Sequence, residues 1–222
     1  MNNEKKNKKG QRIVRIKDII IITNFKCMFS SINKLNICEL NPKDNLNYKK
    51  IFLYRNPIDR TISCFLNWMV KVPKKKNVLT YANPNFLYNH QVGWLLPILC
   101  KETSFNFHYY KNLLRKNNII QLFKMYILML KNIKDKNEHM HNQINILIKR
   151  KFKIDIFINI DKPEDIVILK NIVKQELLIS NNSCDTQKKI LNDFINENLK
   201  FRNKLYEIYK DDFDFFKHKK LL

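Results

Sequence analysis

Lys26, Ser30 and Ser31 form a group of side chains that suits phosphate. They follow the apolar run 18–25, and the lysine precedes the two hydroxyls by four and five residues. A buried strand that feeds a short loop with a lysine and paired hydroxyls presents backbone N–H groups, an ammonium and a helix N-terminus to an anion. The loop has no glycine and lacks the adjoining lysine and hydroxyl of the G-x-x-x-x-G-K-[ST] loop of nucleoside triphosphatases. On its own, the segment fits a serine helix cap beside a solvated lysine at least as well.

Arg55 and Ser63 form a second group that suits phosphate. Arg55 ends the apolar run 50–55, Pro57 fits the first turn of a helix, and Ser63 lies two helical turns further on. Ligands bind at the carboxyl edge of a parallel sheet, and arginine offers a two-pronged fork to a phosphate. The alternative is that Arg55 pairs with an acidic neighbour and that Ser63 is an ordinary helical residue. Together, the two groups predict a site for a nucleotide that carries two phosphate groups.

Three apolar segments of strand length must position these groups, namely 18–25, 50–55 and 154–160. Helical periodicity occurs at 58–70, 113–131, 138–149, 164–177, 187–199 and 202–216. Strands that alternate with helices predict an α/β fold of three layers, with a central, mainly parallel sheet flanked by helices. We expect residues 1–17 to form a basic, mobile N-terminal segment and residues 18–222 to form a single α/β domain. The irregular stretch 71–112 is expected to form a substrate-facing excursion or lid.

The two groups stand in the segments FKCMFSSI and RNPIDRTIS, which are followed by EHMHNQ and LYEIYKDDF. In this order the segments resemble four motifs of the sulfotransferases that use 3′-phosphoadenosine 5′-phosphosulfate (PAPS), in particular of the carbohydrate sulfotransferase branch. These motifs are P-K-x-x-x-[ST]-[ST], R-[DN]-P-x-x-R-x-x-S, H-x-x-x-Q and Y-x-x-D-[FY], and the second match is the most specific. Phe25 replaces the usual proline, and Met28 and Phe29 stand where the family has small residues. Only 28 residues separate Lys26 from Arg55, which is a short interval for this branch.

The resemblance implies a P-loop-like fold and the transfer of a sulfuryl group from PAPS to an acceptor hydroxyl on a carbohydrate, without a metal. Lys26 would contact the 5′ phosphosulfate and stabilise the charge on the bridging oxygen as the sulfuryl group leaves. The serine hydroxyls and the loop amides would hold the same phosphate, while Arg55 and Ser63 would bind the 3′ phosphate. The cofactor-binding residues implied in this way are Lys26, Cys27, Ser30, Ser31, Ile32, Arg55 and Ser63.

A general base must also take the proton of the acceptor hydroxyl. His139 is the expected base, because it begins the H-x-x-x-Q match and because histidine titrates near neutral pH. His141 would face elsewhere if 138–149 is a helix. Glu39, the only glutamate between the phosphate loop and Arg55, and His90 are further candidates.

The charge of the chain suits an anionic partner. Lys and Arg number 42 against 20 Asp and Glu, which gives a formal net charge of +22 and attracts phosphate, sulfate or polyanions. Lysine is abundant throughout while glycine occurs only twice, so a chain-wide composition bias accounts for much of this charge. A basic nucleic-acid-binding protein therefore remains an alternative, although no nucleic-acid motif occurs. A catalytically inactive nucleotide-binding relative is another, whereas the loop disfavours a nucleotide kinase.

The remaining composition bounds the setting. The five cysteines are scattered, with no spacing suited to zinc, so reduced thiols are expected. We find no apolar leader and no uninterrupted apolar stretch of about 18 residues, the length that a membrane span needs. The sequence thus predicts a soluble, cytoplasmic protein with no membrane span. Its expected partner is a hydroxyl-bearing acceptor, a glycan, with no specific nucleic acid.

Overall fold

The computed structural model describes residues 13–24, 27–32, 34–35, 48–68, 118–133, 140–174, 177 and 185–222. They divide into two compact units. The sheet unit comprises the described parts of Met1–Asn56, Gln143–Asn181 and Phe215–Leu222. The helical unit comprises those of Pro57–Asn142 and Asn182–Asp214.

The sheet unit is built on one mixed, mostly parallel sheet. Its described strands are β1 (Ile13–Ile16), β2 (Ile19–Ile22), β3 (Lys49–Tyr54) and β4 (Ile156–Asn159), in the spatial order β1-β2-β3-β4. β1 runs antiparallel to β2, whereas β2, β3 and β4 are parallel neighbours. Ile22 pairs with Phe52, and Tyr54 pairs with Asn159. The carboxyl ends of the three parallel strands therefore meet at one edge of the sheet.

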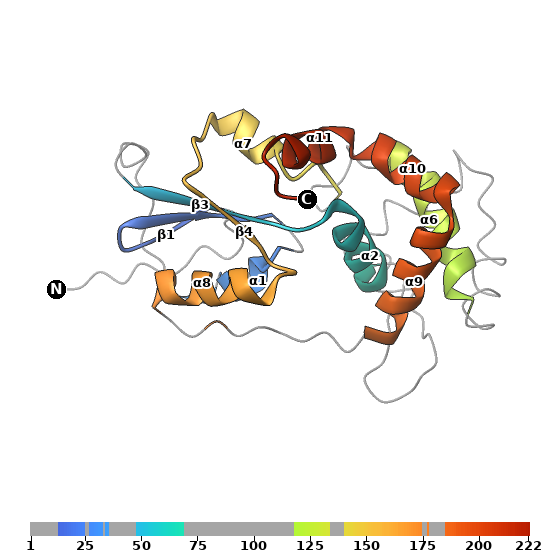
Figure 1. Ribbon diagram of the computed structural model, residues 1–222, viewed down its shortest axis with the longest axis horizontal. Coiled ribbons are helices and arrows are strands. Elements are labelled where there is room, and N and C mark those ends of the chain that lie inside the picture. Colours follow the sequence, from blue (N-terminus) through green and yellow to red (C-terminus); the bar gives the residue numbers. More distant parts are fainter. Residues whose placement is uncertain are drawn as a thin grey trace, which may run out of the picture. The chain divides into compact units, whose positions relative to one another are not determined.

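Helices cover both faces of this sheet because successive strand residues point to opposite sides. On one face, Ile21, Ile51 and Leu53 pack with α1 (Phe29–Ile32) and α8 (Pro163–Val173). On the other, Ile22, Phe52 and Tyr54 pack with α7 (Asn145–Arg150) and the last residues of α11 (Lys210–His218). Figure 1 shows α1 and α8 on one side of the strands and α7 on the other. This arrangement leaves the carboxyl edge of the strands to the loops.

The helical unit contains α2 (Pro57–Trp68), α6 (Ile119–Ile133), α9 (Asp185–Glu197), α10 (Leu199–Ile208) and most of α11. Its core is aromatic at the centre, where the ring of Phe65 lies 4.9 Å from that of Phe123 and 5.4 Å from that of Tyr126. Offset and tilted aromatic pairs at such distances are favourable beyond the area that they bury. In the part of the chain that the structure describes, no helix is long and apolar enough to cross a membrane.

The structure confirms the expected α/β class, the mostly parallel sheet and the three apolar strands. It adds β1, which lies within the segment that we expected to be mobile. The expected helix 138–149 is wrong in its first part, since residues 140–144 form turns and α7 begins at Asn145. The expected helix 202–216 is divided at Tyr209, which caps α10 before α11 begins. The stretch 71–112 and residues 1–12 lie outside the described residues.

Lysine occupies backbone positions that usually favour glycine. The described residues with left-handed φ angles near 50–56° are Lys17, Met28, Lys151, Lys174 and Lys220. Lys151 and Lys174 are the C-caps of α7 and α8. Glycine would be the common choice at these helix ends, because a Cβ atom disfavours the left-handed region.

Tyr54, at the carboxyl end of β3, should make the protein sensitive to alkali. The residue is only 2% exposed, and its hydroxyl donates to the carbonyl of Leu221 at 3.0 Å. Burial, and then the Asp165 carboxylate, raises the pKa of Tyr54 from 10.0 to about 12. Because the neutral hydroxyl is the form favoured in the folded state, its contribution to stability is complete below pH 10 and is lost as the pH rises to about 12.

The shift in the pKa of Tyr54 corresponds to roughly 2–3 kcal/mol of folding free energy. Urea denaturation of the wild type and of Tyr54→Phe, at several values between about pH 9 and pH 12, should show the smaller alkaline loss in the variant. Tyr206→Phe, on α10, is the control, since this ring is partly exposed. Equal alkaline losses in the wild type and Tyr54→Phe would contradict the assignment.

Candidate functional site

The residues that follow the three parallel strands gather at the carboxyl edge of the sheet. Thr23 and Asn24 follow β2, Arg55 follows β3, and Asp161 follows β4 by two residues. Open parallel sheets bind their ligands at this edge. Gln143, which comes from a fourth segment, makes hydrogen bonds with the loops that follow β2 and β3.

The loop after β2 is closed by its own hydrogen bonds. The Thr23 hydroxyl donates to the carbonyl of Cys27, and the Cys27 amide donates to the carbonyl of Asn24 at 3.0 Å. The left-handed Met28 then turns the chain into α1, where the amides of Ser31 and Ile32 both donate to the Met28 carbonyl at 3.0 Å. The described amides of this loop thus hold its own turn in place.

This arrangement locates the predicted phosphate loop. The side chains of Cys27 and Ile32 are fully buried, and Ser31 is 9% exposed. Ile32 packs in the core beneath the sheet. Lys26 lies outside the described residues, and of Ser30, which belongs to α1, the side chain is not described. Their contact with a phosphate therefore stays a prediction.

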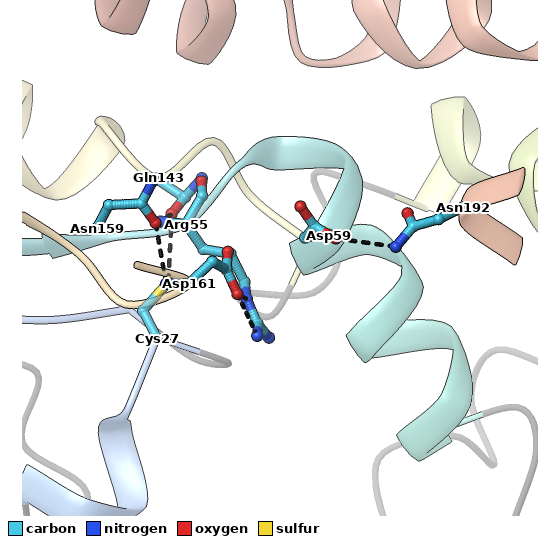
Figure 2. Close-up of polar contacts among 7 residues, drawn as sticks. All are labelled: Cys27, Arg55, Asp59, Gln143, Asn159, Asp161 and Asn192. Carbon is cyan, nitrogen blue, oxygen red and sulfur yellow. Dashed lines mark hydrogen bonds and ion pairs between the residues drawn. The ribbon is translucent and has the colours of Figure 1, made fainter. Parts of the chain in front are cut away.

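Gln143 joins the loop after β2 to the end of β3. Its side chain accepts from the Arg55 amide at 3.0 Å and donates to the Arg55 carbonyl at 2.8 Å, so that it pairs with this residue as a neighbouring strand would. The same oxygen accepts from the Cys27 thiol at 3.2 Å, and the Gln143 carbonyl accepts from Asn24 at 2.6 Å. Figure 2 shows Cys27 and Arg55 meeting at this fully buried residue.

The guanidinium of Arg55 contacts Asp161. Its Nε lies 2.7 Å and one terminal nitrogen 2.6 Å from the same carboxylate oxygen (Figure 2). Asp161 is itself fixed, since its amide donates to the Asn159 side chain at 3.0 Å. The two side chains are 13% and 24% exposed, so the pair stands at the surface of the edge. The acidic neighbour that the sequence left open for Arg55 is therefore present.

Ser63 and His141, the other predicted residues that the structure describes, belong to the helical unit. Ser63 is partly exposed on α2, in the helical unit. His139, Glu39 and His90 lie outside the described residues. The remaining candidate base, His141, is partly buried, and its carbonyl accepts from Arg60 at 2.7 Å.

Arg60, the second arginine of RNPIDRTIS, makes a buried structural contact. It is 2% exposed in the helical unit, where it holds the turn at His141. In the same unit, Asn142 donates to Asp211 at 2.7 Å, and Asn192 donates to Asp59 at 3.3 Å (Figure 2). These contacts connect segments that are far apart in the sequence. The contacts of Arg60 and Asp211 hold the turn at His141 and Asn142 in place.

Two residues of the edge were missed from the sequence. Asp161 has a readable signal, because it follows β4 as Arg55 follows β3, and neighbouring parallel strands end together. Gln143 has none beyond its place in H-x-x-x-Q, since its partners are 88, 116 and 119 residues away. Among the described residues, His, Cys, Asp and Glu nowhere gather in threes that could hold a metal ion.

Comparison with known proteins identifies no relative: no protein-family model, no curated protein and no solved structure matches the chain. Function must therefore be inferred from the edge of the sheet together with the resemblance of the four sequence segments.

Proposed function

We propose that the chain binds PAPS at the carboxyl edge of β2 and β3 and transfers its sulfuryl group to an acceptor hydroxyl on a carbohydrate. One observation carries the proposal: Gln143 fastens the loop after β2 to the backbone of Arg55. The loop proposed to bind phosphate follows β2, and Arg55 follows the adjacent parallel strand β3. This is the place at which α/β sheets bind nucleotides, and the helices on both faces of the sheet are compatible with the P-loop-like fold that the proposal requires.

Each part of the site has a distinct task in this reaction. An acceptor oxygen forms a bond to sulfur while the bond between sulfur and the bridging phosphate oxygen breaks, and 3′-phosphoadenosine 5′-phosphate (PAP) leaves. Lys26 and the serines of the loop stabilise the charge on the bridging oxygen, by analogy with phosphoryl transfer. His139 takes the proton of the acceptor hydroxyl. Arg55 binds the 3′ phosphate.

Asp161 modifies this assignment. A phosphate that binds Arg55 meets a guanidinium already in contact with a carboxylate, and like charges at such distances repel. The 3′ phosphate must therefore share Arg55 with Asp161 or displace it. A surface ion pair contributes only about 0–1 kcal/mol, so a phosphate that receives two charge-assisted hydrogen bonds can displace the carboxylate.

Isothermal titration with PAP and with adenosine 5′-phosphate tests the proposal. The two ligands differ by the 3′ phosphate, and two charge-assisted hydrogen bonds to it should make PAP bind about a hundredfold more tightly. Equal affinities would contradict a 3′-phosphate site, and absence of PAP binding would contradict the proposal as a whole. Tight, salt-sensitive binding to random DNA without PAP binding would instead support the nucleic-acid alternative.

A transfer assay then addresses the acceptor. Radiolabelled PAPS should label a glycan in a panel that also contains phenolic, peptide and lipid hydroxyls. Lys26→Ala should reduce the rate of transfer by more than it reduces the affinity for PAP, because its expected task is in the departure of the sulfuryl group. PAP binding without transfer to any acceptor would point to the inactive nucleotide-binding relative.

A further inference from the structure

One face of the sheet unit carries a concentration of positive charge. The cations lie in two segments that are distant in sequence: α7 with the residues after it, and the end of α11 with the residues after it. Both segments pack on the same face of the sheet, since Leu147 and Phe216 share one core cluster with Phe52 and Tyr54. The exposed basic residues of this face are Lys149, Arg150, Lys151, Lys153, Lys217, Lys219 and Lys220. We call this set the basic face.

The opposite face of the same sheet provides an internal comparison. In residues 145–155 and 215–222, the seven cations of the basic face are accompanied by one carboxylate, Asp155. The described residues of α1, α8 and their ends carry Lys34, Lys162, Lys170 and Lys174 against Asp161, Glu164 and Asp165. A chain-wide excess of lysine would raise the positive charge of both faces alike. Among the described residues, the basic face therefore carries the larger excess of positive charge.

Aliphatic side chains stand exposed within the basic face. Ile148 is 64% exposed between buried Leu147 and Lys149, and Leu222 is 50% exposed after Leu221, which packs in the same core cluster as Leu147. Among the described residues, the large exposed apolar side chains are all aliphatic, and Phe152 and Phe215 of this face pack inward. Single-stranded nucleic acid is held by exposed aromatic rings, whereas clustered cations with exposed aliphatic groups suit the surface of an anionic bilayer.

We propose that the basic face binds an anionic lipid surface. The lysines and Arg150 contact the phosphate and carboxylate groups of the lipids, and Ile148 and Leu222 enter the boundary between headgroups and acyl chains. Each Lys or Arg near such a surface contributes about 1 kcal/mol, so seven are sufficient for reversible association without a membrane span. The inference is independent of the proposed nucleotide site.

Cosedimentation with vesicles of phosphatidylcholine, with and without phosphatidylserine, tests this proposal. The wild type should bind only the vesicles that contain phosphatidylserine, and added salt should weaken the binding. Joint replacement of Lys149, Arg150 and Lys151 with glutamine should reduce the partition coefficient by about a hundredfold. The matched control replaces Lys170 of α8 and its two capping residues, Lys162 and Lys174, because each triple removes three charges and includes one left-handed C-cap.

A second pair of variants tests the apolar contact. Ile148→Asp should weaken vesicle binding, whereas Ile168→Asp, at a 47% exposed position of α8, should have little effect. Circular dichroism confirms that each variant is folded. Equal losses in the α7 and α8 triples would overturn the proposal, since the binding would then follow net charge alone. Failure of the wild type to bind the anionic vesicles, or binding of random RNA at a salt concentration that abolishes lipid binding, would also overturn it.

Discussion

Replacing Arg55 with alanine should weaken the binding of PAP by about a hundredfold, since it removes charge-assisted hydrogen bonds of about 1.5–3 kcal/mol each. The affinity for adenosine 5′-phosphate should change much less, because Arg55 is assigned to the 3′ phosphate alone. Isothermal titration of both ligands into the wild type and the variant measures the difference. A loss of equal size for the two ligands would place Arg55 elsewhere in the site.

The acidic partner of Arg55 supplies the opposite variant. Asp161→Asn removes the competing carboxylate, so the affinity for PAP should rise severalfold, with a loss of stability of at most about 1 kcal/mol. Arg202→Ala on α10 is the charge control for Arg55→Ala, since both remove one positive charge, and it should leave the affinity for PAP unchanged. If Asp161→Asn weakened PAP binding, Asp161 would be needed to orient Arg55, and the competition inferred from their contact would be wrong.

Replacing Gln143 with leucine should lower the free energy of unfolding by about 3 kcal/mol, because it removes two hydrogen bonds to a part-buried stretch of backbone. The amide and carbonyl concerned belong to Arg55, and the same change releases the Cys27 thiol. PAP binding should weaken as well, since Arg55 and the loop after β2 are no longer fastened together. Urea denaturation and PAP titration measure the two effects.

A rescue variant separates positioning from general destabilisation. Gln143→Glu keeps an oxygen for the Arg55 amide and for Cys27 but removes the donor to the Arg55 carbonyl, so its PAP affinity should lie between those of the wild type and Gln143→Leu. Gln121→Leu, the same change at a partly exposed position of α6, should cost less than about 0.5 kcal/mol. If Gln143→Leu were as stable as Gln121→Leu, the hydrogen bonds of Gln143 would not hold the edge together.

The sheet was predictable because its strands carry their own signal. Segments such as Ile19–Ile22 and Lys49–Tyr54 are buried on both faces, and an unbroken apolar run of strand length is typical of such strands. β1 escaped prediction because its four residues, Ile13–Ile16, lie among lysines and include Arg15. Pairing with β2 supplies the stability that its local sequence lacks. Such pairing depends on tertiary context, which a single sequence does not report.

The charged residues of the candidate site were predictable from the sequence, whereas the residues that hold them in place were not. Arg55 stood out because it ends an apolar run. Helical periodicity continued through 140–144, yet Asn142 and Gln143 are held in turns by partners from distant parts of the chain. Buried side-chain amides of this kind make hydrogen bonds with residues about a hundred positions away in the sequence. Local sequence patterns do not reveal such bonds.

The lysines at left-handed positions affect how much further change the chain can tolerate. Each residue other than glycine in this conformation costs about 1–2 kcal/mol, and native proteins have only about 5–15 kcal/mol in reserve. A sequence with two glycines has met the demands of its turns with Lys17, Lys151, Lys174 and Lys220. The scarcity of glycine therefore lowers the stability of the fold, so that it tolerates fewer destabilising substitutions. Selection acting on this chain should be unusually intolerant of cavities in its aromatic and isoleucine-rich cores.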